Sequence, residues 1–217
     1  MLFRVICLGF IAFSSLYSTE SEQAFTNIYD NHIWGKNEEG RGHSGGGSTV
    51  SNTVIYRAFL QKFLKENNIT SVVDIGCGDW EFSKTINWDN VTYTGYDVVR
   101  SVIERNKKVY QKPNIVFIHG DVTELDLPEA DLMVTKDVLQ HLPNEYIKKI
   151  LKKTKQFKYC LITNDLDSAS YSSDNHDTKV GGYRPLDLTK SPFFVNAQKV
   201  LTFQTSCGVK QVILIKN

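Results

Sequence analysis

The acidic residues that follow apolar runs in this chain have the positions best suited to chemistry. Asp74 lies in the apolar run 72–75, and a Gly-x-Gly turn follows at Gly76 and Gly78. A buried strand, a tight glycine turn and a helix that opens at Asp79 are typical of the first unit of a nucleotide-binding α/β sheet. Glycines in the turn accept positive φ and let a ligand approach the backbone closely.

The residues beside this turn discriminate between nucleotide ligands. A dinucleotide site needs Gly-x-Gly-x-x-Gly, with a pyrophosphate on the helix N-terminus. Here Glu81 occupies the third glycine position, and Asp79 lies nearby. Two carboxylates repel a pyrophosphate but suit a ligand that carries positive charge and no phosphate. S-adenosylmethionine, with its sulfonium and ammonium groups, is such a ligand.

Four segments, in order, resemble the motifs of the class I S-adenosylmethionine-dependent methyltransferases. The first is the acidic-x-Gly-x-Gly segment at Asp74. The second resembles the family's second strand (91–97), the third the end of its third strand (116–122), and the fourth its fourth strand with the loop that faces the methyl group (131–142). At strand-plus-helix spacing, four such motifs are strong evidence and cover roughly the central third of the chain.

This resemblance implies roles for single residues in binding the methyl donor. Asp97 is implied to bind both ribose hydroxyls, and Asp121 the adenine amino group, with the backbone N–H of Val122 against the ring. Asp74, Gly76 and Gly78 are expected to shape the methionine end, and Lys136 is a further expected donor-binding residue. The alternatives are that Asp74 is a structural acceptor for neighbouring N–H groups, and that Asp97 and Asp121 form turns.

Further segments resemble one branch of the same superfamily, but they supply no substrate. They are Cys77–Trp80, Lys136–Leu142, Gly181–Leu188 with Ser191–Phe193, and Ser44–Ser48 downstream of Trp34. Members of this branch often resemble small-molecule or sugar methyltransferases. Trp80 stands where many superfamily members carry a third glycine, so the turn must accommodate its ring or point it outward.

The acceptor side needs a group that can remove a proton from an oxygen or nitrogen nucleophile. His141, just past the expected fourth strand, is the first candidate because histidine titrates near neutrality; local packing at a helix start is the equal alternative. Asp137 is the second catalytic candidate, although it could also form a surface ion pair with Lys136. The expected acceptor-binding residues are Trp34, His176, Asp177, Tyr183 and Arg184.

The long polar segment 165–192 supplies second-choice bases. These are Asp165, Asp167, His176 and Asp177, which with His141 could also hold a divalent metal. Solvated loop carboxylates are more common than metal ligands, so no metal is expected. No Asn-Pro-Pro-Tyr-like segment and no Pro-Cys nucleophile are present, which argues against base methylation. The expected acceptor is therefore an oxygen or nitrogen atom of a small molecule, a sugar or a protein side chain.

Two other functions share features of this pattern. An NAD-dependent oxidoreductase would use the same glycine turn, but Glu81 opposes it. A non-catalytic cofactor-binding module would keep the fold without chemistry, and the acidic residues at 74, 97 and 121 oppose that reading.

Composition limits the class of protein. The chain of 217 residues fits one domain, and its 25 basic residues nearly cancel 24 acidic ones. Without a broad cationic field, no nucleic-acid partner is expected. The four cysteines lack paired spacing, so neither a disulfide framework nor a zinc site is predicted.

The N-terminus has the pattern of a secretory signal peptide. A basic start (1–4) precedes an apolar run (5–13) and a short stretch that ends at Ser18. The run is too short for a comfortable transmembrane helix. The expected divisions are a signal peptide (1–18), a polar lid (19–47) and the donor-binding domain (48–217). Secretion is the expectation, with a retained segment and a cytoplasmic location as the alternative, because the methyl donor is a cytosolic metabolite.

The elements expected around these residues alternate between strand and helix. Expected strands are 71–75, 92–96, 115–118, 131–135, 158–164, 199–205 and 210–215, and expected helices are 48–67, 79–86, 99–111 and 143–156. Such alternation predicts an α/β, Rossmann-like, seven-stranded sheet that is mainly parallel, with helices on both faces. The terminal hairpin makes the last strand antiparallel.

Overall fold

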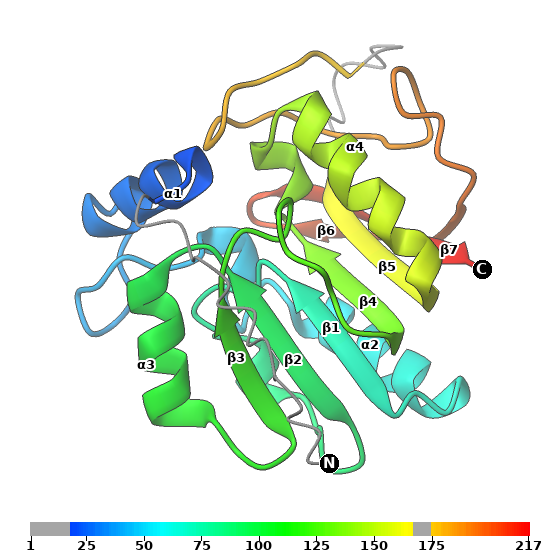
Figure 1. Cartoon of the computed structure of the whole chain (residues 1–217), viewed down its shortest axis with the longest axis horizontal. Helices are drawn as coiled ribbons and strands as arrows, with labels where there is room; N and C mark the ends of the chain where they lie inside the picture. The colour runs from blue at the N-terminus through cyan, green and yellow to red at the C-terminus, as the bar shows by residue number, and fades with distance from the viewer. Residues whose placement is uncertain (1–17, 167–174) are drawn as a thin grey trace, which may run out of the picture.

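The fold is built on a seven-stranded sheet. The computed structural model describes residues 18–166 and 175–217. The strands are β1 (Ser71–Ile75), β2 (Thr92–Asp97), β3 (Ile115–His119), β4 (Ala130–Lys136), β5 (Phe157–Leu166), β6 (Gln198–Thr205) and β7 (Gly208–Lys216). Their order is β3-β2-β1-β4-β5-β7-β6 (Figure 1). This confirms the expected sheet.

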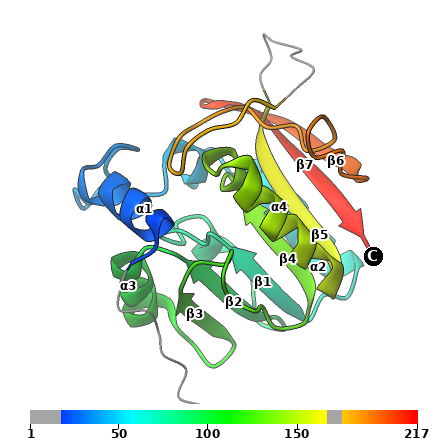
Figure 2. The ribbon, with the colours of Figure 1, turned by 45° about the horizontal axis from the view of Figure 1, so that its top comes forward.

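The direction of the strands follows from their connections. The first five strands pair in parallel, with Asp74 of β1 opposite Gly95 of β2 and Val134 of β4. β7 pairs antiparallel with both β5 and β6, and β6 forms the edge of the sheet opposite β3 (Figure 2). The sheet order reverses at β1, where β2 and β4 lie on its two sides. Open sheets of this kind bind ligands beyond the carboxyl ends of the strands at such a point.

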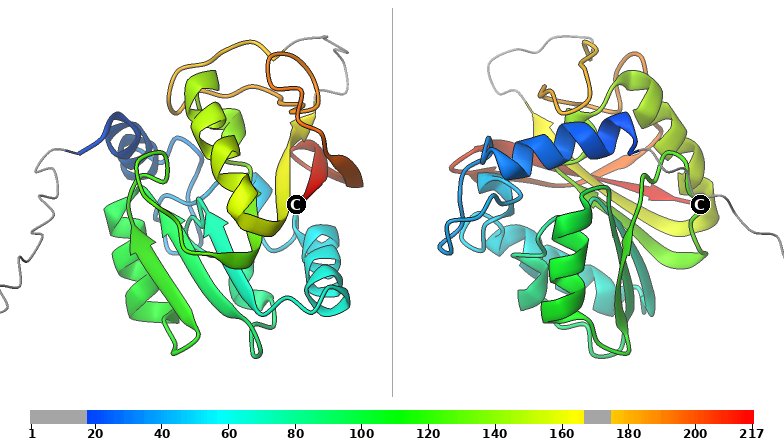
Figure 3. Two further views of the ribbon diagram at one scale, coloured as in Figure 1. Left: turned by 45° about the vertical axis from the view of Figure 1, so that its right-hand side comes forward. Right: turned by 60° about the vertical axis from the view of Figure 1, so that its left-hand side comes forward.

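Helices pack on both faces of the sheet. They are α1 (Glu20–Asp30), α2 (Val54–Glu66), α3 (Arg100–Tyr110) and α4 (Asn144–Lys153). Alternate strand residues supply two separate cores: Val72 packs with α2, whereas Val73 packs with α4. α2 and α4 lie on opposite faces, and α1 lies across the ends of the strands (Figures 1 and 3).

The helix expected at 79–86 does not form. A turn follows Gly78, and a short 3₁₀ segment covers Ser83–Thr85. Trp80 explains the difference because its backbone has φ +59°, outside the right-handed helical region. Its buried ring packs against Tyr93, with ring centroids 5.6 Å apart, and against Phe117 at 5.3 Å. The turn therefore accommodates the bulky ring by turning it into the core.

The polar segment 19–47 does not begin as an extended lid. It begins with α1, whose first turn is capped by Thr19, since the Thr19 hydroxyl accepts the N–H of Glu22 at 3.1 Å. Phe25, Ile28 and Tyr29 are buried on one face. Their i, i+3, i+4 spacing is the signal that a reading of overall polarity overlooks.

The other elements begin and end close to their predicted positions. The largest differences are at the start of α2, which is Val54, and at the end of α4, where a 3₁₀ turn covers Thr154–Gln156. The N-cap of α2 is Thr53. Nearly all of the expected signal peptide, residues 1–17, lies outside the described residues. Within the described ranges, no helix combines the length and the apolar character needed to cross a membrane.

Candidate functional site

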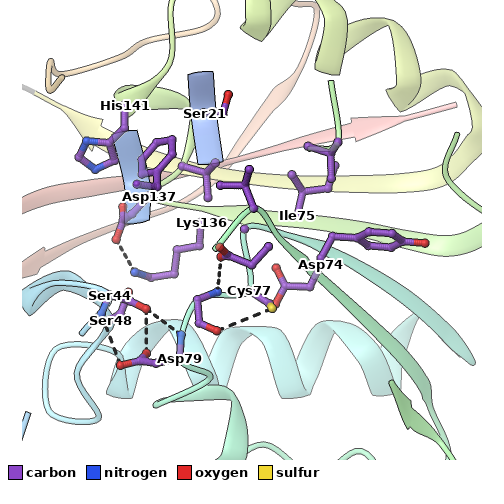
Figure 4. A pocket seen from close by; sticks show the side chains of 18 of the residues that line it. Ser21, Ser44, Ser48, Asp74, Ile75, Cys77, Asp79, Lys136, Asp137 and His141 are labelled. Carbon is purple, nitrogen blue, oxygen red and sulfur yellow. Dashed lines mark hydrogen bonds and ion pairs between the residues drawn. The ribbon is translucent and has the colours of Figure 1, made fainter. Parts of the chain in front are cut away.

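A pocket opens at the carboxyl ends of β1, β2 and β4 and is covered by α1 (Figure 4). Its lining includes all of the expected donor-binding residues: Asp74, Gly76, Gly78, Asp97, Asp121, Val122 and Lys136. His141, Asp137 and Trp34 line the same pocket. The structure therefore brings the expected donor site and both candidate bases together.

The glycine turn after β1 requires glycine at both positions. Gly76 has φ +71° and Gly78 has φ +55°. A Cβ on Gly78 would lie 2.1 Å from the Ser44 hydroxyl oxygen, and one on Gly76 would lie 2.3 Å from a methyl carbon of Val138. The turn is thus packed tightly between two other segments, and its backbone forms part of the pocket wall.

Asp97 holds this turn while facing the pocket. One carboxylate oxygen accepts the N–H of Gly78 at 2.9 Å, and the other accepts the N–H of Val99 at 2.9 Å. Burial raises the pKa of Asp97, against the effect of these backbone donors. Each carboxylate oxygen keeps a further lone pair, so the side chain can also accept hydrogen bonds from a ligand.

Asp74 lies in the same wall but has a different partner. The Tyr93 hydroxyl donates to its carboxylate at 2.6 Å, so Asp74 accepts from a tyrosine rather than from the neighbouring N–H groups of the structural alternative. Burial raises the pKa of Asp74 to about 7. A positive ligand in the pocket favours its ionised form.

Asp121 and Val122 close the pocket beneath the start of α1. Asp121 accepts the N–H of Thr123 at 2.9 Å, so it stabilises a turn, which was the alternative to a donor-binding role. Its other oxygen accepts from the hydroxyl of Thr19, the cap of α1, at 3.2 Å. Asp121 therefore ties the turn after β3 to the helix that covers the pocket.

A buried ionic network replaces the surface ion pair considered for Lys136 and Asp137. The Lys136 ammonium lies 2.5 Å from the Asp137 carboxylate and donates to the carbonyl of Gly47 at 2.8 Å. Lys210 of β7 bridges Asp137 at 3.0 Å and Asp165 of β5 at 2.5 Å. Burial alone would raise the pKa of Asp137, but the two lysines hold it below its ordinary value. This favours a permanently ionised, positioning role for Asp137.

His141 has the geometry of a neutral base. Its Nδ1 lies 2.7 Å from the carbonyl oxygen of Gly182, and because a carbonyl only accepts, Nδ1 carries the proton. Nε2 then has the lone pair, which accepts a long hydrogen bond from the side-chain amide of Gln140 at 3.4 Å. Burial lowers the pKa of His141, which keeps the ring neutral. The ring packs beside Trp34, with centroids 4.9 Å apart.

The expected acceptor-binding residues divide into two groups. Trp34 lines the pocket, and Tyr183 lies beside His141 with ring centroids 5.8 Å apart, its hydroxyl donating to Asp165 at 3.1 Å. Arg184 does not line the pocket; it is buried and donates to the carbonyl of Leu142 at 2.8 Å.

His176 and Asp177 also lie outside the pocket lining, and both are exposed. Asp177 accepts the N–H of Asn144, the first residue of α4, at 2.8 Å. It therefore caps a helix, and the long polar segment does not bring these two residues to the donor. Of the second-choice bases, Asp165 is held by Lys210, and Asp167 lies outside the described residues.

Several pocket residues were missed by the reasoning from sequence. They come from α1 and from the glycine-rich segment before α2: Ser21, Phe25, Tyr29, Ser44 and Ser48. The Tyr29 hydroxyl lies 2.7 Å from that of Ser44, which in turn donates to Asp79 at 2.8 Å. The helical spacing of the apolar residues in α1 was the available signal for the first three; the contacts of Ser44 join residues 35 positions apart in the chain.

Comparisons with known proteins identify a methyltransferase domain and similar folds. Residues 72–157 match the family model of the methyltransferase domain. Among solved structures, the chain is similar to the N-methyltransferase NodS of Bradyrhizobium japonicum WM9 with bound S-adenosyl-L-homocysteine, at 14% identity and a TM-score of 0.59 over 78% of this chain and 89% of that one. Similarity to magnesium protoporphyrin IX methyltransferase of Synechocystis PCC 6803 with bound S-adenosylmethionine covers 93% of this chain and 98% of that chain, at 14% identity and a TM-score of 0.57.

A third structure is the mitomycin 7-O-methyltransferase MmcR, at 16% identity and a TM-score of 0.54 over 75% of this chain and 54% of that one. No curated protein matched the chain significantly. The TM-scores, at such low identities, show a common fold and no more. The family match supports a transferase over the NAD-dependent oxidoreductase considered from the sequence.

Proposed function

We propose that this chain, a methyltransferase of the class I fold that uses S-adenosylmethionine, methylates an oxygen or nitrogen atom with His141 as the base. The acceptor is a small molecule, a sugar or a protein side chain. The donor binds in the pocket along Asp74, the glycine turn and Asp97, with its adenine toward Asp121. The negative charge of this wall suits a cationic donor.

The tautomer of His141 is the observation that carries the proposal. With Nδ1 committed to the Gly182 carbonyl, Nε2 is the proton acceptor of a ring that lines the pocket, and its one hydrogen-bond partner among the described residues is the long contact from Gln140 at 3.4 Å. A neutral imidazole can take the proton of a hydroxyl group as the methyl group is transferred, or the proton of an ammonium group beforehand, which frees the nitrogen lone pair that attacks. Methyl transfer then follows by in-line displacement at the sulfonium carbon, and the chain's main task is to align the two reactants.

Aromatic side chains define the acceptor side of His141. The rings of Trp34 and Tyr183 both pack against the ring of His141. Flat apolar surfaces beside a single polar base suit an acceptor that is compact and partly apolar, such as a ring or a sugar face. The similar structures include an N-methyltransferase and an O-methyltransferase, so both acceptor atoms stay within the proposal.

A screen with isotopically labelled methyl donor tests the proposal. Purified protein is incubated with metabolite, glycan and protein fractions, and the label is sorted by fraction. We expect label in one acceptor class with the wild-type chain and its loss with His141→Asn. Donor binding without transfer to any fraction would favour the non-catalytic module instead.

We also propose that residues 1–18 are a signal peptide and that the protein is secreted. The support is the sequence pattern alone: a basic start, a short apolar run and a polar stretch. Mass spectrometry of protein from its native source tests this. A chain that begins near Thr19 supports cleavage, whereas an intact Met1 on the functional protein contradicts it and favours the cytoplasm.

A further inference from the structure

Outside the expected base and donor contacts, a histidine and two carboxylates converge at the edge of the pocket. His43, Asp79 and Glu81 each offer one ligand atom, and these atoms lie within 4.8 Å of one another. Asp79 and Glu81 also line the donor pocket, so the cluster lies at its boundary. We propose that these three residues bind a divalent transition metal ion.

The His43 side chain supports a ligand role more strongly than the carboxylates alone. His43 is 9% exposed, and no hydrogen bond to its ring is present among the described residues. The ring nitrogens of His43 are not among the fully enclosed polar atoms without a partner, so they keep some contact with solvent. A nitrogen lone pair on a largely buried ring is therefore free to bind an ion that enters from the pocket edge.

The backbone around His43 is built to hold the ring in place. A Cβ on Gly42 would lie 2.0 Å from the carbonyl oxygen of Tyr29, so only glycine lets the segment come this close to α1. A Cβ on Gly35 would lie 3.0 Å from Nε2 of His43, so glycine there leaves room for the ring. Two glycines thus define the position of one histidine.

The carboxylate of Asp79 is oriented by neighbouring groups. The hydroxyl of Ser44 donates to one of its oxygens at 2.8 Å, and the backbone N–H of Ser44 approaches the other at 3.4 Å. Hydrogen bonds of this kind fix a metal ligand from behind and leave a lone pair on each oxygen free to coordinate. Because Ser44 follows His43 directly, the same contact brings the histidine to the carboxylates.

The mixture of ligands selects the type of ion. One imidazole and two carboxylates suit a transition metal such as Mn²⁺ or Co²⁺, whereas Mg²⁺ and Ca²⁺ prefer oxygen alone. Ligand atoms about 2.1 Å from a common ion lie at most about 4.2 Å apart, so side-chain shifts below 1 Å close the site. The ion would cross-link the His43 segment to the turn after β1. Because Asp79 and Glu81 line the pocket, the ion would lie at the pocket edge.

Titration with Co²⁺ tests this site without reference to methyl transfer. Tag-free protein is titrated in a calorimeter and by visible absorption. We expect one equivalent to bind to the wild-type chain and the affinity to fall at least tenfold in His43→Ala and in Glu81→Gln. Glu81→Gln keeps the size of the side chain and removes its charge. His176→Ala, an exposed histidine outside the pocket, is the matched control and should bind as the wild type does.

Two results would overturn the proposal. One is equal Co²⁺ affinity in the wild type, His43→Ala and Glu81→Gln, all shown to be folded by circular dichroism. The other is competitive displacement of Co²⁺ by S-adenosylmethionine, which would assign the two carboxylates to the donor's ammonium group. Donor affinity measured without metal in the same variants reports separately on the donor pocket.

Discussion

His141 and Gly182 are joined by a 2.7 Å hydrogen bond that determines which ring nitrogen carries the proton. The bond is reinforced by the backbone, since the N–H of Gly181 donates to the carbonyl of His141 at 3.0 Å, and the N–H of Arg184 donates to that of Gln140 at 3.2 Å. The Gly-Gly-Tyr-Arg segment therefore positions the base from behind. This explains the place of Arg184, which supports the loop that contains His141 instead of contacting an acceptor.

Replacing the base should affect the chemical step alone. In His141→Asn, we expect kcat to fall by roughly 10²- to 10⁴-fold, the usual contribution of a positioned base. Donor affinity should stay unchanged, because the glycine turn and Asp97 do not contact this ring in the described structure. Steady-state kinetics with the identified acceptor and calorimetry with donor separate the two effects. An unchanged kcat would remove His141 from the mechanism.

The pH dependence of activity follows from the burial of His141. Burial lowers its pKa below the ordinary value of 6.5, so the neutral, base-competent form persists at lower pH than for an exposed histidine. We therefore expect the acidic limb of the kcat profile to lie below pH 6.5 and activity to be lost only as pH falls through it. A limb well above 6.5 would contradict the neutral tautomer. The profile of kcat, measured at saturating donor and acceptor, reports this group.

Much of the donor site could be predicted from local sequence because its residues follow strand ends directly. Asp74, Gly76 and Asp97 each lie in or next to a short apolar run, and parallel strands bring such ends together. The parts that were missed depend on contacts that are distant in sequence. Lys210 reaches Asp137 across 73 positions, and no local pattern shows it. The sequence also showed that Trp80 replaces a glycine, but it left open where the ring goes. The structure shows that the backbone of Trp80 is left-handed and that its ring is buried in the core.

The pKa of Asp74 predicts that donor affinity depends on pH. Its folded pKa is about 7, so a large part of the carboxyl is protonated at and below that pH. A cationic donor favours the ionised form, and we expect affinity to rise as pH increases through about 7. For the free protein the sign is opposite: the stabilisation from Asp74 is fully present below its ordinary pKa of 3.8 and is lost as pH rises through about 7.

Calorimetry between pH 6 and 8 measures this dependence. In Asp74→Asn the carboxyl is absent, so the affinity should be lower and nearly independent of pH in this interval. A wild-type affinity that falls with rising pH would contradict the assignment of Asp74 to the donor pocket.

Asp97 should contribute strongly to donor binding. Hydrogen bonds from two ribose hydroxyls to its carboxylate are charge-assisted, each worth on the order of 1.5–3 kcal/mol. Asp97→Ala should therefore lower donor affinity by at least roughly tenfold. Because Asp97 also accepts the N–H groups of Gly78 and Val99, Asp97→Asn is the milder companion: it keeps one acceptor oxygen for one of these groups and loses the charge and the second acceptor. Calorimetry measures donor affinity in both variants, and circular dichroism checks that they are folded. Unchanged affinity in a folded Asp97→Ala would mean that the donor does not bind at Asp97.

Removing Lys210 should destabilise the fold because two buried carboxylates share its ammonium group. Lys210 is 2% exposed and lies 3.0 Å from Asp137 and 2.5 Å from Asp165. Lys210→Met leaves Asp165 without its cation, and breaking a buried pair in this way costs roughly 3–5 kcal/mol. Adding Asp165→Asn removes the unpaired charge, so the double variant should recover part of the loss.

Lys199→Met is the control. It removes an ammonium group that pairs with Asp187 on a side chain that is 47% exposed, and it should cost at most about 1 kcal/mol. Urea unfolding of the four proteins measures these differences, and equal losses for Lys210→Met and Lys199→Met would show that the network adds nothing to the stability of the fold.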